Sequence, residues 1–117
     1  MRNAFKLLLL VLILCTMSAS TAALSEEWNV TNPYNWATIG GGYDDEGFRM
    51  RASANNNGIV QVALFAQGED EPFVDDIFLS ANEPFDWCGA VFAVKAKKYS
   101  GTGAQYGSIW PDCIWPH

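Results

Sequence analysis

Aromatic side chains are concentrated in the C-terminal segment from Tyr106 to Pro116, which includes Trp110, Trp115 and two Trp-Pro steps. Aromatic rings of this kind can stack on the C–H faces of sugar rings, so one interpretation is a binding platform. The other is that Trp110 and Trp115 cover the open end of the core, because large aromatics dominate burial in small domains. Because proline disfavours helices and central strands, we expect this segment to be an extended cover or an ordered loop.

A second aromatic group, Trp28, Tyr34 and Trp36, surrounds the sequon Asn29-Val30-Thr31. In a host that glycosylates exported chains, Asn29 would carry an N-linked glycan. A glycosylated asparagine must be exposed, so we expect this segment to be an N-terminal arm rather than a buried strand. Tyr34 and Trp36 are the binding candidates from this group.

The N-terminus has the composition of a secretory signal peptide. Arg2 and Lys6 precede an apolar run from Leu7 to Cys15, and small residues follow as far as Ala23. The apolar run is too short for a membrane anchor, which needs roughly 20 residues. We therefore predict a signal peptide over residues 1–23, a single domain over 24–117, and a secreted protein, extracellular or periplasmic in a bacterium. A lipidated Cys15 is the alternative, disfavoured by the bulky residue before it.

Cleavage before Leu24 leaves two cysteines, Cys88 and Cys113. In an oxidising compartment, an even pair in a short chain predicts one disulfide. Such a bond would stabilise the domain by about 3 kcal/mol according to the chain-entropy model. It would also tie the aromatic C-terminal segment to the core.

The predicted mature chain is acidic. Without Arg2 and Lys6 it has five basic residues against 13 acids, a formal charge of −8. Nucleic acid and anionic membrane are therefore poor partners, whereas a glycan or an extracellular protein remains open. Lys95, Lys97 and Lys98 form the one basic patch. It either contacts an acidic partner or protects a strand edge against aggregation.

Acidic residues cluster at Asp44–Glu46, Glu69–Glu71 and Asp75-Asp76. Carboxylates suit calcium, but none of these clusters has the spacing of a calcium-binding loop, so we predict no cofactor beyond weak calcium binding.

The mature chain has a single histidine, His117, at its last position. Histidine-dependent catalysis is therefore disfavoured, and we expect a non-catalytic protein. A hydrolase using carboxylates alone is the remaining enzymatic alternative.

Short alternating or β-branched segments predict a mainly β fold. The strongest pattern is a hairpin, with strands over residues 48–53 and 59–66 joined at Asn55–Gly58, because Asn-Gly favours tight turns. In the first strand, Phe48, Met50 and Ala52 alternate with Arg49, Arg51 and Ser53, which predicts one apolar face and one face in water. The second strand is apolar almost throughout, which predicts a central position in its sheet. Further strands are predicted over residues 73–80, 87–98 and 36–39, the last ended by Gly40–Gly42. About five strands would make a small antiparallel sandwich or barrel.

Two functions of different class follow from these observations. The first is a secreted, non-catalytic domain that binds a carbohydrate or cell-surface component through exposed aromatics, with Tyr34, Trp36, Tyr106, Trp110 and Trp115 as candidates. The second is a secreted effector, such as a toxin, antimicrobial or inhibitor, that acts on a protein or membrane target. The position of the aromatics distinguishes them: a row of rings with polar neighbours favours sugar, and a contiguous apolar patch favours the other targets.

Overall fold

A computed structural model describes residues 24–116 of the chain, so the predicted signal peptide and His117 lie outside the described residues. The described part contains eight strands and no helix, and therefore no helix that could span a membrane. The strands are β1 (Glu26–Val30), β2 (Ala37–Tyr43), β3 (Phe48–Ala52), β4 (Val60–Phe65), β5 (Val74–Leu79), β6 (Pro84–Trp87), β7 (Val91–Lys98) and β8 (Gln105–Pro111).

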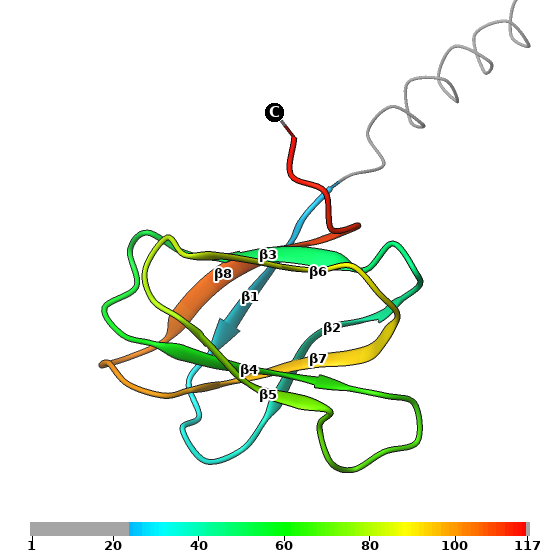
Figure 1. Cartoon of the computed structure of the whole chain (residues 1–117). Helices are drawn as coiled ribbons and strands as arrows, with labels where there is room; N and C mark the ends of the chain where they lie inside the picture. The colour runs from blue at the N-terminus through cyan, green and yellow to red at the C-terminus, as the bar shows by residue number, and fades with distance from the viewer. Residues whose placement is uncertain (1–23, 117) are drawn as a thin grey trace, which may run out of the picture.

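The strands form two antiparallel sheets that pack face to face (Figure 1). The first sheet has the order β1-β8-β3-β6, and the second has the order β2-β7-β4-β5. Four antiparallel pairs, β1 with β8, β2 with β7, β3 with β6 and β4 with β5, wind around the core in the manner of a jelly roll. The predicted antiparallel β-sandwich is confirmed, although it has eight strands instead of about five.

The inner faces of both sheets supply the hydrophobic core. In β3, Phe48, Met50 and Ala52 are fully buried, as their alternation in the sequence predicts. The apolar β4 lies between β7 and β5, which confirms its predicted central position. The structure also contains the predicted Cys88–Cys113 disulfide.

The predicted hairpin at Asn55–Gly58 is wrong. β3 belongs to the first sheet and β4 to the second, so this loop carries the chain between layers. Its asparagines act through their side chains. Asn56 is buried and exchanges hydrogen bonds with both backbone groups of Tyr106, at 2.7 and 2.8 Å, and Asn57 donates to Thr102. The Asn55–Gly58 segment therefore closes one end of the sandwich instead of making a tight turn.

The single strand predicted over residues 87–98 is also wrong, because it is divided between the two sheets. β6 ends at Trp87 in the first sheet, and β7 begins at Val91 in the second. Cys88 lies in the connection. Simple alternation also fails near this crossing, because Val91 and Val94 both belong to the core, whereas Phe92 is 54% exposed.

The N-terminal part contains more strand than its sequence indicated. Residues 26–30 form β1 instead of an irregular arm, and β2 continues through Gly40–Gly42 to Tyr43, with a register shift after Thr38. Glycine suits this part of β2 because the backbones approach closely. A Cβ on Gly41 would lie 2.4 Å from the carbonyl oxygen of Phe92. The glycines therefore continue the strand rather than end it.

The first part of the C-terminal segment is a strand and not the extended cover or loop that its prolines suggested, and only residues 112–116 continue beyond the sheet. Residues 105–111 form β8, which lies between β1 and β3 in the middle of the first sheet. Proline is tolerated because Pro111 is the last residue of the strand. Gly107 makes room for the buried Trp28 ring, since a Cβ there would lie 2.0 Å from the indole.

Candidate functional site on the outer face of the first sheet

β8 directs alternate side chains to the outer face of the first sheet. Gln105, Gly107 and Ile109 are buried, so Tyr106, Ser108 and Trp110 point outward. Residues paired with these three on the neighbouring strands also point outward, so the outward side chains form three rows across the sheet. Their paired residues are Asn29 with Tyr106, Glu27 with Ser108, Ser108 with Arg51, Trp110 with Arg49, and Arg49 with Asp86.

A hollow of about 180 Å³ lies on this face, and we call it the β8 hollow. Two aromatic residues line it, Tyr106 and Trp110, and the Tyr106 side chain is 52% exposed. The lining also includes Glu27, Arg51, Asn82 and Ser108, which are polar and come from four different parts of the chain. The β8 hollow therefore combines ring faces with a carboxylate, a guanidinium, an amide and a hydroxyl.

The polar groups of the β8 hollow are held by hydrogen bonds within the protein. The hydroxyl of Ser108 lies 3.0 and 2.9 Å from the two carboxylate oxygens of Glu27. Arg51 donates to the backbone carbonyl of Asn82 at 2.8 Å, and its guanidinium lies 5.1 Å from the Trp115 ring centre. These contacts fix the side-chain directions and leave further donors and acceptors on each group for a ligand.

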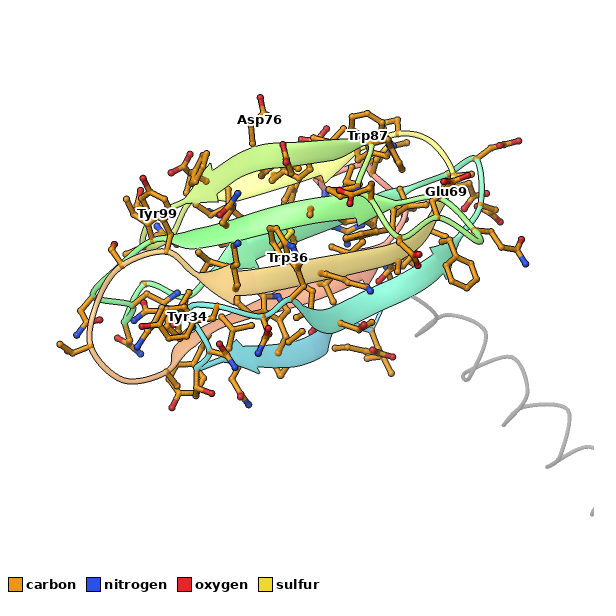
Figure 2. All side chains as sticks on the ribbon, turned by 90° about the horizontal axis from the view of Figure 1, so that it is seen from below. Tyr34, Trp36, Glu69, Asp76, Trp87 and Tyr99 are labelled. Carbon is orange, nitrogen blue, oxygen red and sulfur yellow. A yellow bond between two sulfur atoms is a disulfide. The ribbon has the colours of Figure 1, made fainter. Side chains whose placement is uncertain are left out.

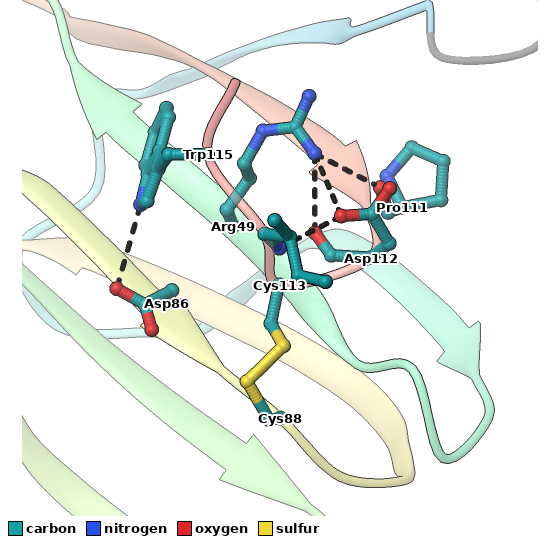
Figure 3. A network of polar contacts seen from close by, with 8 residues as sticks. Arg49, Asp86, Cys88, Pro111, Asp112, Cys113 and Trp115 are labelled. Carbon is teal, nitrogen blue, oxygen red and sulfur yellow. Dashed lines mark hydrogen bonds and ion pairs between the residues drawn. A yellow bond between two sulfur atoms is a disulfide. The ribbon is translucent and has the colours of Figure 1, made fainter. Parts of the chain in front are cut away.

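Arg49, next to the β8 hollow, is enclosed by the C-terminal segment (Figure 3). Its guanidinium carbon lies 5.3 Å from the ring centre of Trp110 and 5.5 Å from that of Trp115. Nη1 donates to Asp112 Oδ1 at 3.0 Å, in the one ion pair among the described residues. Only 6% of Arg49 is exposed, so a charge predicted to face water is covered by two indoles and balanced by Asp112.

The C-terminal segment is attached to the sandwich at several points. The disulfide joins Cys113 to Cys88, and the backbone amide of Cys113 donates to the carbonyl of Glu46 at 2.9 Å. The indole Nε1 of Trp115 donates to Asp86 Oδ1 at 3.4 Å (Figure 3). Trp115 is thereby positioned against Trp110, with ring centres 5.5 Å apart. Neither indole belongs to the core cluster, so they cover Arg49 on the outer face instead of the end of the core.

The other two predicted binding residues are not part of this site. Trp36 packs on the outer face of the second sheet, as Figure 2 shows, beside a small cluster formed by Ala63, Phe65 and Ala93. Tyr34 is 85% exposed in the loop before β2. The second aromatic group of the sequence is therefore divided, with Trp28 in the core, Tyr34 in a loop and Trp36 on the sheet opposite the β8 hollow.

Asn29 is exposed on β1, although its neighbours Trp28 and Val30 are buried in the core. The sequon is therefore accessible, and it lies in a strand at the edge of the first sheet instead of in an irregular arm.

Among residues 24–116, no three acidic, histidine or cysteine side chains converge as metal ligands. Asp75 and Asp76 lie within β5, opposite a register shift in β4, and the other two acidic clusters lie in loops.

A second hollow, of about 400 Å³, opens at the end of the sandwich near Tyr43 and Phe92. Burial raises the pKa of the Tyr43 phenol, and the nearby Glu26 carboxylate raises it further. The hydroxyl therefore stays neutral in the folded protein. The lining is mainly apolar, and its one charged residue is Asp44, so it offers few groups that could orient a polar ligand.

Sequence reasoning named Tyr106, Trp110 and Trp115 as candidates but did not name Glu27, Arg51, Asn82 and Ser108, which also line the β8 hollow. One signal for Ser108 was available: Tyr106, Ser108 and Trp110 alternate with small or apolar residues, which is the pattern of a strand with one polar face. The other partners are brought to the site by strand pairing over long sequence distances, which no local pattern reveals.

Comparison with known proteins gave no significant match to a family model, a curated protein or a solved structure.

The enclosure of Arg49 predicts a clear effect on stability. Arg49→Ala should lower the free energy of unfolding by about 2 kcal/mol, because it removes a partly buried ion pair and the packing of the guanidinium against two indoles. Arg49→Met should recover part of this loss, since the methionine side chain still packs against the rings. Urea unfolding measures both variants. Arg51→Ala is the control and should cost at most about 1 kcal/mol, because its hydrogen bond is exposed. An Arg49→Ala protein as stable as the wild type would contradict the described packing.

Proposed function

We propose that this chain is a secreted, non-catalytic domain that binds carbohydrate at the β8 hollow. The observation that carries the proposal is the placement of Tyr106 and Trp110 on either side of Glu27, Ser108 and Arg51 on one sheet face. Because one fold can host many functions, the proposal depends on this site and not on the jelly-roll topology.

The chemistry of the hollow suits a sugar. A sugar ring presents C–H groups on its faces and hydroxyl groups around its rim. Aromatic faces match the C–H groups, while Glu27 accepts and Arg51 donates hydrogen bonds to hydroxyls. One carboxylate and one guanidinium also balance each other within the lining, which favours a neutral sugar over a charged one.

The spacing along β8 favours an oligosaccharide over a single ring. Tyr106 and Trp110 are four residues apart in one strand, which corresponds to about 13 Å between their Cα atoms. Two rings at that separation can contact different sugar units of one chain. The hydroxyl of Ser108 lies between them on the same face.

Most of the proposed binding groups stand on paired strands. Glu27 comes from β1, Tyr106, Ser108 and Trp110 from β8, and Arg51 from β3. Their positions are set by the sheet, so binding would order little additional structure, which lowers its entropic cost.

Two observations support the rest of the proposal. The Cys88–Cys113 disulfide is consistent with an oxidising compartment, as a secreted protein requires. Glu27 is the single carboxylate in the lining of the β8 hollow, whereas glycoside hydrolysis usually uses two on either side of the bond. The single carboxylate in the lining therefore favours binding over catalysis.

The proposal predicts that Tyr106→Ala or Trp110→Ala lowers glycan affinity by about tenfold or more while the protein stays folded, since losing a stacking ring costs roughly 1 to 2 kcal/mol. A glycan array identifies an oligosaccharide probe, and calorimetry then measures its dissociation constant. Tyr34→Ala is the matched control, because it removes the same side chain from an exposed loop elsewhere and should leave affinity unchanged. Equal losses in all three variants, or no loss in any of them, would contradict the proposed site.

A second candidate function is an effector that contacts an acidic partner protein through the outer face of the second sheet. Lys95 Nζ lies 4.5 Å from the ring centre of Phe65, and Lys97 Nζ lies 4.5 Å from that of Trp36. β7 is paired on both sides, by β2 and β4, so its lysines do not protect a sheet edge as one interpretation suggested. Phe78 and Tyr99, 42% and 60% exposed, contact each other edge to face and extend the aromatic surface.

The two candidates predict different charge dependence. Under the second candidate, Lys95→Glu with Lys97→Glu should abolish capture of an acidic peptide probe, and added salt should weaken capture by the wild type. Under the leading proposal, the same double variant should bind the oligosaccharide as tightly as the wild type, because the substituted face lies on the other sheet. The two candidate functions are distinguished by measuring capture of the acidic peptide and of the oligosaccharide on a surface carrying the wild type or the double variant, each at two salt concentrations.

A further inference from the structure

The sequon asparagine projects from the edge of the face that contains the β8 hollow. Asn29 is exposed in β1, and its side chain points outward because Trp28 and Val30 are buried on the inner side. Thr31, the third residue of the sequon, is also exposed. Asn29 therefore lies on the same outer face as Glu27, its neighbour two residues earlier in the strand.

Asn29 lies directly opposite Tyr106 in the pairing of β1 with β8. Both backbone groups of Tyr106 are used on the β3 side of the strand: its amide donates to Asn56 Oδ1, and its carbonyl accepts from Ser53 and from Asn56 Nδ2. Toward β1, Asn29 and Tyr106 therefore form a pair without backbone hydrogen bonds. Side chains come closest in such pairs, with Cβ atoms about 4.5 to 5.5 Å apart.

This pairing would place a glycan on Asn29 next to the proposed ligand site. The first sugar, an N-acetylglucosamine joined to Asn29 Nδ2, would begin beside the half-exposed ring of Tyr106. The ring can receive the C–H face of that sugar as it would receive the C–H face of a free ligand. Tyr106 lines the β8 hollow, so both sugars would need the same aromatic surface.

We propose that Asn29 carries an N-linked glycan whose first sugar packs on Tyr106 and restricts the β8 hollow, so that the glycosylated protein binds external oligosaccharide more weakly than the unmodified one. The inference deepens the proposed function and, for its effect on binding, rests on it. Packing of the sugar on Tyr106 rests on the strand pairing alone.

The packing is tested without any external ligand. The full chain is expressed in a eukaryotic secretory host, and intact mass before and after amidase treatment gives the occupancy of Asn29. The glycan is then trimmed enzymatically to one sugar, and the acetyl methyl resonance of that sugar is recorded by NMR. We expect an upfield shift from the Tyr106 ring that disappears in the glycosylated Tyr106→Ala variant. An unmodified Asn29, or a methyl resonance that does not depend on Tyr106, would overturn the inference.

The effect on binding is tested with the oligosaccharide probe selected on the array. The fully glycosylated protein should bind about tenfold more weakly than Asn29→Gln and Thr31→Ala, two variants that remove the sequon in different ways. Equal affinity of occupied and sequon-free proteins would overturn the proposed restriction. If the sequon-free variants bind no oligosaccharide, the proposed function has failed instead, and the NMR result still decides whether the sugar packs on Tyr106.

Discussion

The structure depends on the position of β8 between β1 and β3. This pairing brings the last strand of the chain into the middle of the first sheet, and its register aligns Tyr106, Ser108 and Trp110 with polar residues from two other strands. A shift of one residue would turn these side chains into the core and Ile109 toward solvent. Burial of Ile109 and the close fit of Gly107 against Trp28 oppose such a shift. The same constraint that closes the sandwich therefore builds the proposed binding face.

Features of the fold could be predicted from the sequence where they follow from one strong local pattern or from the chemistry of one residue type. The cysteine pair predicted the disulfide, alternation predicted the inward face of β3, and a nearly continuous apolar run predicted the central position of β4. The aromatic C-terminal segment marked Tyr106, Trp110 and Trp115 either as a binding platform or, for the two tryptophans, as a cover of the core. The structure places all three on one face, where the two indoles contact each other and cover Arg49. Their role in binding is a proposal.

The remaining features depend on contacts between distant parts of the chain. Asn55–Gly58 resembles a hairpin turn, but the side chain of Asn56 is used to bond the backbone of Tyr106, 50 residues away in the sequence. Prolines and glycines made β8 and the end of β2 look irregular, whereas packing against Trp28 and Phe92 requires small residues there. Glu27 and Arg51 could not be assigned to a site because only the strand register brings them beside Ser108.

The most direct test of the central claim is an NMR titration of the uniformly labelled, sequon-free domain with a neutral oligosaccharide selected on a glycan array. If the β8 hollow is the site, amide and side-chain shifts should change on the outer face of the first sheet, at residues 27, 51, 106, 108 and at the Trp110 indole. Signals from Trp36 and the lysines of β7 should stay unchanged. Changes confined to the second sheet, or none at saturating sugar, would contradict the account.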